Sequence, residues 1–208
     1  MQRSNICIPR LYAILDGSCF GDGEFLFGAA QSFVSAGVTL LQYRDKSGNA
    51  RQILDRAQEL KRRLANSVKL IMNDRADLAL AAGFDGVHVG QDDLSPTGTR
   101  KVIGSKLWLG VSTHNPEQVR EADDTTADYL AIGPVFGTKS KERPDPIVGL
   151  DGVRAARALT QKPLVAIGGI TRENCRSVVE AGADSVAVIA DLVHDPGKSA
   201  EEFLRILG

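Results

Sequence analysis

The sequence predicts a (β/α)₈ barrel, and three observations support this fold class. Short apolar runs rich in β-branched residues recur along the chain, and segments with helical periodicity lie between them. Eight such runs can be identified. Most are apolar throughout, which is typical of parallel strands covered by helices on one face and by the barrel interior on the other. An open sheet with fewer strands is the alternative, because the run GVHV is short.

The expected strands and helices follow in strict alternation. The strands begin at Leu11, Val38, Val68, Gly86, Lys106, Asp128, Pro163 and Ser185. Helix start signals lie between them, at Asn73 or Asp74, Ser95-Pro96, Asn115-Pro116 and Thr171. There is no low-complexity tract or linker. We therefore expect one domain over residues 1–208, with an N-terminal extension over about residues 1–10.

Composition excludes several classes of partner. The 208 residues are 43% hydrophobic, and 25 basic against 26 acidic side chains give a net charge of −1. With this net charge the protein as a whole does not attract nucleic acid or anionic lipid electrostatically. Cys7, Cys19 and Cys175 form no CxxC pair, which suits a reduced cytoplasmic protein. No apolar run reaches the ~18 residues of a membrane span, so we expect a soluble protein, with a homo-oligomer possible.

Polar residues at the carboxyl ends of barrel strands are candidates for function, because barrel active sites are built there. The second strand ends LLQYRDK, where alternation places Gln42 and Arg44 on one side and Lys46 follows at the rim. A structural explanation is equally available, in which Arg44 pairs with a carboxylate and Gln42 satisfies backbone groups.

Two carboxylates end adjacent strands. Asp74 follows the third strand and Asp93 follows the fourth, so both can face one cavity. Like charges there repel unless a cation lies between them, and Mg²⁺ takes one or two carboxylates together with substrate phosphates and water. The alternatives are a helix cap at Asn73 or Asp74, a turn at Asp93 and a satisfied core histidine at His88. The fifth strand adds Ser112 and His114 to the same rim.

The loops after the seventh and eighth strands contain features that are typical of an anion-binding site. The seventh strand ends AIGGIT, a glycine pair that we expect to open a helix and to present backbone N–H groups to a phosphate. The loops after the seventh and eighth strands form the common phosphate site of this fold. The connection over about residues 134–149 is long, basic and rich in proline, and we interpret it as a lid over the site.

Several segments resemble the successive motifs of thiamine phosphate synthases. They are LLQYRDK, LIMNDRADLALAAGFDGVHVGQDDL, LGVSTHN, YLAIGPVFGTKSK, VAIGGIT and AGADSVAVIADL, in this order over about residues 11–192. The resemblance implies a Mg²⁺-dependent (β/α)₈-barrel transferase. Such an enzyme couples 4-amino-2-methyl-5-(diphosphooxymethyl)pyrimidine to a thiazole ethyl phosphate, with or without a carboxylate, and releases pyrophosphate through a dissociative reaction.

The resemblance also implies roles for individual residues. Positions contacting the pyrimidine diphosphate are matched by Gln42, Arg44, Lys46, Asn73, Ser112 and Lys141, and His88 lies near the pyrimidine. Of these, Arg44, Lys46, Lys141 and Ser112 are the predicted catalytic residues. Asp74 and Asp93 match Mg²⁺ ligands. The positions that hold the thiazole phosphate are matched by Thr138, Ser140, Gly169, Ile189 and Ala190, and the predicted substrate site also includes Tyr43, Asp45 and Lys139.

Three positions depart from the family pattern: Tyr43 replaces an aliphatic residue, Gly137 a proline and Ala190 a serine. Ala190 lacks a hydroxyl donor for the thiazole phosphate, although backbone N–H groups can bind it. Two rival functions are a related thiazole tautomerase and a catalytically silent barrel that binds thiamine phosphate. Asn73, Asp74, Asp93 and Lys141 together favour the synthase.

Overall fold

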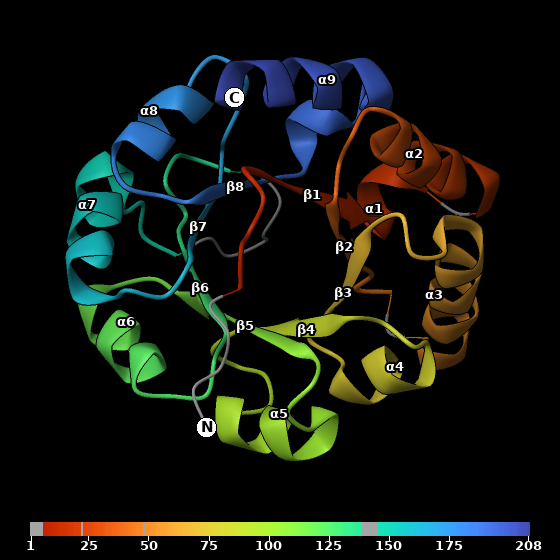
Figure 1. Cartoon of the computed structure of the whole chain (residues 1–208), viewed down its shortest axis with the longest axis horizontal. Helices are drawn as coiled ribbons and strands as arrows, with labels where there is room; N and C mark the ends of the chain where they lie inside the picture. Colours follow the sequence, from red (N-terminus) through yellow and green to blue (C-terminus); the bar gives the residue numbers. More distant parts are fainter. Residues whose placement is uncertain (1–5, 22, 48, 139–144) are drawn as a thin grey trace.

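The computed structural model describes residues 6–21, 23–47, 49–138 and 145–208. In these residues eight parallel strands close into a barrel in sequence order, and β8 pairs with β1. Figure 1 looks into the ring of strands, which the helices surround. The predicted barrel is confirmed, and the open sheet is excluded by the closing pair Leu11 and Val186.

Each strand overlaps one of the predicted apolar runs, and the observed starts lie within two residues of the predicted ones. They are β1 (Leu11–Asp16), β2 (Leu40–Arg44), β3 (Lys69–Asn73), β4 (Gly86–Val89), β5 (Trp108–Thr113), β6 (Tyr129–Ile132), β7 (Leu164–Ile167) and β8 (Ser185–Val188). The helices are α1 (Gly17–Phe20), α2 (Gly23–Ser35), α3 (Ala50–Leu64), α4 (Ala76–Ala81), α5 (Pro96–Ile103), α6 (Pro116–Asp123), α7 (Gly149–Leu159), α8 (Cys175–Glu180) and α9 (Pro196–Leu207), with a 3₁₀ turn, η1 (Ala190–Leu192), after β8.

Strand alternation divides the apolar side chains between two cores. The larger core lies between the strands and the surrounding helices and includes Leu41, Tyr43 and Phe203. The smaller core fills the barrel interior and includes Ile14, Leu40 and the tyrosines of β1 and β6. Because consecutive residues of a strand point to opposite faces, most strands contribute to both cores, which explains their apolar runs. The exception is β4, which contributes only to the larger core.

Two of the predicted helix starts are confirmed by their capping bonds. The Ser95 side chain accepts a hydrogen bond from the N–H of Gly98, and Asn115 accepts one from Gln118, with proline following each cap. The start predicted at Asn73 or Asp74 is wrong, because α4 begins after Arg75 without a side-chain cap. The start predicted at Thr171 is also early, since α8 begins after Asn174.

The N-terminal segment contributes to the barrel core. Ile8 is buried in the interior core, and Ile6 packs against the same core together with Trp108 at the start of β5. At least this part of the predicted extension closes the amino-terminal end of the barrel. Among the described residues, no helix combines the length and apolar character that crossing a membrane requires.

Gly86 is one of the positions where the fold leaves no room for a side chain. A Cβ there would lie 2.6 Å from the carbonyl oxygen of Trp108 and 2.8 Å from Cδ1 of Ile71. We expect Gly86→Ala to lower the free energy of unfolding by about 1–3 kcal/mol, because an overpacked core must move its neighbours. Urea denaturation measures this change.

The control is Gly28→Ala in α2, where an added Cβ meets nothing within 4 Å. Alanine is the better helix former, so this variant should be about 0.5–1 kcal/mol more stable than the parent. Equal effects of the two substitutions would contradict the close packing at Gly86.

Candidate functional site

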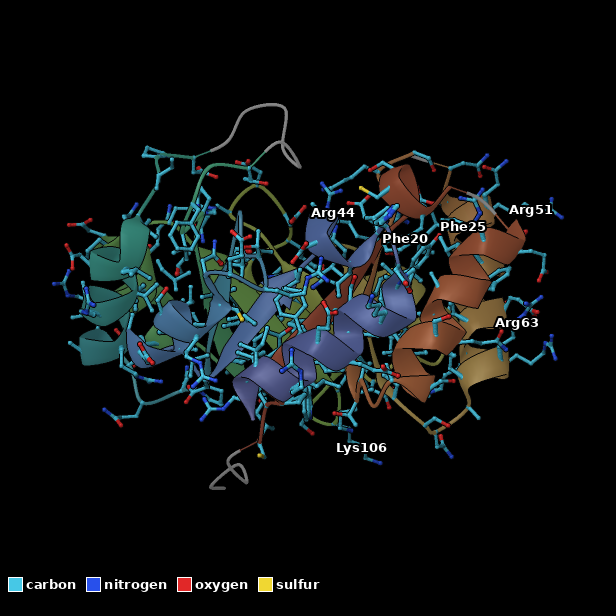
Figure 2. All side chains as sticks on the ribbon, turned by 90° about the horizontal axis from the view of Figure 1, so that it is seen from above. Phe20, Phe25, Arg44, Arg51, Arg63 and Lys106 are labelled. Carbon is cyan, nitrogen blue, oxygen red and sulfur yellow. The ribbon has the colours of Figure 1, made fainter. Side chains whose placement is uncertain are left out.

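The candidate site lies at the carboxyl ends of the strands. Figure 2 shows Arg44, at the end of β2, near one end of the barrel and Lys106, which precedes β5, near the opposite end. All eight described strands run in parallel, so their last residues meet at the rim that Arg44 marks.

The guanidinium of Arg44 is held by a carboxylate at the end of the neighbouring strand. Arg44 forms an ion pair with Asp16, whose side chain is almost fully buried. Asp16 also accepts a hydrogen bond from the N–H of Ser18 and so caps α1. The sequence left open whether Arg44 pairs with a carboxylate, and the structure shows that it pairs with Asp16. This ion pair holds the Arg44 guanidinium in place at the rim. Asp16 was not predicted, although it ends a strand as the predicted residues do.

Asp74 and Asp93 meet at the rim beside a lysine. Lys46 forms an ion pair with Asp74, a partner that the sequence did not reveal. Burial, followed by the nearby Asp74 carboxylate, raises the pKa of Asp93, and Lys46 and the Gly90 N–H act in the opposite direction. Asp93 also accepts the Gly90 N–H at 2.7 Å. The expected convergence of two like charges is thus present.

The backbone at Asp74 is unusual for a residue with a side chain. Its φ of 61° lies in the left-handed region, which aspartate tolerates better than most residues. The N–H of Asp74 donates to the carbonyl oxygen of His88 at 2.7 Å. This sharp turn after β3 replaces the helix cap expected there and turns the chain beside the end of β4.

His88 lies inside the barrel and is hydrogen bonded through both ring nitrogens. Nδ1 is 3.1 Å from the hydroxyl of Tyr129, and Nε2 is 2.9 Å from the hydroxyl of Ser112. Burial lowers the pKa of His88 to about 4, so the imidazole is neutral at pH 7. The expectation of a satisfied histidine is confirmed, and the ring also supports Ser112 at the rim.

The glycine pair after β7 receives the start of the long connection. Gly168 and Gly169 have φ values of 102° and 62°, and a Cβ on Gly168 would lie 2.5 Å from Cβ of Pro134. The N–H of Phe136 donates to the carbonyl oxygen of Gly168. The pair does not open a helix, contrary to the sequence prediction, because α8 begins only at Cys175. Its glycines instead permit the left-handed turn and the close approach of the connection.

An ion pair ties the loop after β7 to the loop after β8. The guanidinium of Arg172 donates to both oxygens of Asp191, at 3.1 Å each, and its backbone N–H donates to the same carboxylate at 2.8 Å. Arg172 also pairs with Glu202 of α9. The bond ties η1, which begins at Ala190, to the loop that follows the glycine pair. Neither residue was predicted from the sequence.

One histidine contacts both described ends of the long connection. Nδ1 of His114 donates to the carbonyl oxygen of Gly133 at 2.6 Å, and Nε2 lies 3.4 Å from Oδ2 of Asp145. Thr138 lies on the described part that follows β6. The predicted residues Lys139, Ser140 and Lys141 lie outside the described residues, as does much of the predicted lid.

Two predicted site residues face away from the interior. Tyr43 alternates with Gln42 and Arg44 and is buried in the core between strands and helices. Its hydroxyl donates to Asp45, which also pairs with Arg56 of α3. The outward direction of Tyr43 follows from the two-residue repeat of the strand, and the assignment of Tyr43 and Asp45 to the substrate site stays a prediction.

A line of polar side chains crosses the barrel interior below the rim. Nε2 of Gln42 donates to the hydroxyl of Tyr12 at 2.8 Å, and the hydroxyls of Tyr12 and Tyr129 are 3.0 Å apart. Through Tyr129 the line continues to His88 and Ser112. Sequence reasoning missed both tyrosines, because they lie in the middle of apolar runs.

Fold and rim together define a (β/α)₈-barrel protein with a charged site at the carboxyl ends of its strands, the arrangement of barrel enzymes. A family model described as thiamine monophosphate synthase matches residues 11–192. The chain is 65% identical to a thiamine-phosphate synthase of Koribacter versatilis over 98% of both chains. It is 43% identical to one of Chloroflexus aurantiacus, over 100% of this chain and 96% of the relative.

A solved structure agrees with these relatives. Thiamine phosphate pyrophosphorylase from Pyrococcus furiosus superposes with a TM-score of 0.85 at 30% identity, over 95% of both chains. The chain belongs to the thiamine monophosphate synthase family, whose members are transferases of thiamine biosynthesis.

The raised pKa of Asp93 predicts how stability depends on pH. The folded protein binds the Asp93 proton more tightly than the unfolded chain, so stability is lost as pH rises from the ordinary value of 3.8 through the raised pKa. Asp93→Asn removes this loss. We expect the variant to be more stable than the parent at pH 7, with a smaller difference near pH 3.8, in urea denaturation.

Asp92→Asn is the matched control, because Asp92 is the exposed neighbour and surface substitutions usually change stability by less than about 0.5 kcal/mol. A marked loss of stability in Asp93→Asn would contradict the expectation. It would mean that the hydrogen bond from Gly90 outweighs the repulsion from Asp74.

Proposed function

We propose that this chain couples 4-amino-2-methyl-5-(diphosphooxymethyl)pyrimidine to a thiazole ethyl phosphate, giving thiamine phosphate and pyrophosphate. The observation that carries the proposal is that the carboxylates of Asp74 and Asp93 lie together beside Lys46. Lys46 follows β2 two residues after Arg44, which supplies a second cation at the rim. Diphosphates are commonly bound by cationic side chains together with Mg²⁺, and this rim combines two cations with two carboxylates that would hold such a metal.

Mg²⁺ fits the donors that the rim provides. Among the described residues, no three or more histidine, cysteine or acidic side chains are grouped so that they could hold a metal. The two carboxylates of Asp74 and Asp93 are therefore the candidate protein ligands. Mg²⁺ uses one or two carboxylates and takes its other oxygens from phosphates and water. Asp74 and Asp93 would hold the ion, which when bound neutralises charge on the diphosphate.

The chain's own cations complete the charge balance. Arg44 is preorganised by the buried Asp16, and Lys46 lies against Asp74. Each can donate to diphosphate oxygens, and Lys141 is assigned the same role by resemblance. Fixed donors aimed at developing charge stabilise a transition state more than the ground state. These groups therefore favour departure of pyrophosphate from the pyrimidine methylene carbon.

The proposed reaction does not depend on a histidine acting as a general base. His88, the histidine in the barrel interior, is neutral and bonded on both sides, so it is suited to holding Ser112 against the pyrimidine rather than to acting as a base. Its neutrality adds no positive charge beside the pyrimidine. This supports a dissociative route, in which the carbon–oxygen bond breaks before the thiazole nitrogen attacks the pyrimidine carbocation.

The thiazole phosphate is assigned to the loops after β7 and β8. Gly169, Ile189 and Ala190 lie on these loops, and the bond between Arg172 and Asp191 holds the loops together. Ala190 has no hydroxyl, so the donors for the phosphate are backbone N–H groups of these loops, together with the hydroxyls that the resemblance assigns to Thr138 and Ser140. We place the reaction in the cytoplasm, which suits the three cysteines, all of them free in the described residues.

A pyrophosphate-release assay with both substrates tests the function. We expect release only with both substrates and Mg²⁺, and its loss in EDTA. Asp93→Asn should lose most activity while it remains folded, and Asp92→Asn should retain activity. Release without Mg²⁺ would remove the metal from the reaction. Tautomerisation of the thiazole without coupling would favour the tautomerase, and binding of thiamine phosphate without turnover would favour the silent barrel.

Lys141→Ala should depress kcat more than it raises KM for the pyrimidine diphosphate. The charge on pyrophosphate grows as the bond breaks, so a cation that acts there strengthens along the reaction. We expect a loss of about 10²–10³-fold in kcat, as for removal of one preorganised donor. Steady-state kinetics decides: a raised KM with unchanged kcat would mean ground-state attraction only, and no change would remove Lys141 from the site.

A further inference from the structure

The polar line inside the barrel contains two tyrosines of the interior core. Tyr12 and Tyr129 are both buried, with exposed fractions of 1% and 0%. Their rings meet edge to face with centroids 6.1 Å apart, and the ring of Tyr129 also lies 5.5 Å from that of His88. Barrel interiors are normally filled with branched apolar residues. Phenylalanine would fill nearly the same space, so packing alone does not explain the hydroxyls.

Each hydroxyl has a definite position in a continuous chain of hydrogen bonds. Gln42 donates to Tyr12, the two tyrosine hydroxyls meet at 3.0 Å, and Tyr129 reaches Nδ1 of His88. Each buried hydroxyl proton needs an acceptor, and the partners of Tyr12 among the described residues are Gln42, which donates to it, and Tyr129. The Tyr12 proton is therefore donated to Tyr129, and the Tyr129 proton is donated in turn to Nδ1 of His88. The direction of every bond follows from the first one.

The direction of the chain decides what Ser112 presents at the rim. With Nδ1 accepting from Tyr129, the neutral imidazole carries its proton on Nε2 and donates to Ser112. The proton of Ser112 is then directed away from His88 and can be donated to an acceptor on the substrate. Reversing any one of these bonds would leave a buried donor or acceptor without a partner, which disfavours the reversed arrangement.

The backbone leaves space for this contact at one glycine. His88, Gly110 and Tyr129 lie at one level on β4, β5 and β6, as the strand register shows. A Cβ on Gly110 would lie 2.2 Å from Cζ of Tyr129 and 2.3 Å from Nδ1 of His88. The missing side chain on the middle strand lets the side chains of the outer two strands meet across it.

We propose, building on the proposed function, that Tyr129 is a positioning residue for the pyrimidine. Its hydroxyl fixes His88 in one tautomer, orients Ser112 as a donor and, through Tyr12, joins both to Gln42. The pyrimidine contacts that the resemblance assigns to Gln42 and Ser112 thus belong to one hydrogen-bonded unit. Tyr129 itself does not touch the reacting atoms.

The test combines Tyr129→Phe with ¹⁵N NMR of histidine-labelled protein. The chain has three histidines, so the spectrum is simple, and His114→Gln and His194→Gln variants assign His88 by elimination. In the parent, His88 should carry its proton on Nε2. In Tyr129→Phe, which keeps the ring, this single tautomer should be lost, and kcat/KM for the pyrimidine diphosphate should fall about 10-fold or more through misplaced contacts.

Thr160→Val is the matched control. It also removes a buried hydroxyl hydrogen bond, between Thr160 and Asp123, but it lies before β7 at the opposite end of the barrel. It should change stability without changing the tautomer or kcat/KM.

Three results would overturn the positioning role. The first is a His88 protonated on Nδ1 in the parent, a measurement that needs no variant to fold. The second is an unchanged tautomer in folded Tyr129→Phe, and the third is a changed tautomer with unchanged kcat/KM. If the parent releases no pyrophosphate, the proposed function fails instead, while the NMR result on the hydrogen-bond chain stands by itself.

Discussion

Closure of the parallel barrel is the constraint on which the rest of the structure depends. Parallel pairing brings every strand end to one rim, so residues far apart in sequence become neighbours there. Closure also fixes the register of the strands and thereby the height of each side chain along the barrel axis. His88, Gly110 and Tyr129 are register partners on successive strands. A shift of one residue in any of these strands would reverse the faces of its side chains and separate the groups.

The rim concentrates features that cost stability. Asp93 has a raised pKa because it is partly buried near Asp74, and Asp74 holds a left-handed backbone conformation. Like charges and strained backbone persist where the surrounding structure enforces them, and they cluster at functional sites. Such costs agree with the proposal that the rim binds a cation and a diphosphate, because a bound cation would remove the repulsion.

The barrel interior shows a different balance. Its lower part is apolar, with Ile8, Leu40 and Ile71 closing the amino-terminal end. Towards the rim, polar groups replace apolar ones, but each of those described has a partner in the chain from Gln42 to Ser112. A satisfied network of this kind holds its members in one arrangement, because breaking one bond leaves a buried polar group unpaired.

The sequence by itself determined the eight strands, two of the helix caps and the inward direction of Gln42 and Arg44, because these features depend on local alternation and local hydrogen bonds. It also placed Asp74 and Asp93 at neighbouring strand ends. Only the tertiary structure decided that Arg44 pairs with Asp16, that the glycine pair receives Pro134 rather than opening a helix, and that Tyr12 meets Tyr129 across 117 positions of sequence. Such contacts depend on barrel closure, strand register and side-chain reach, which no local pattern encodes.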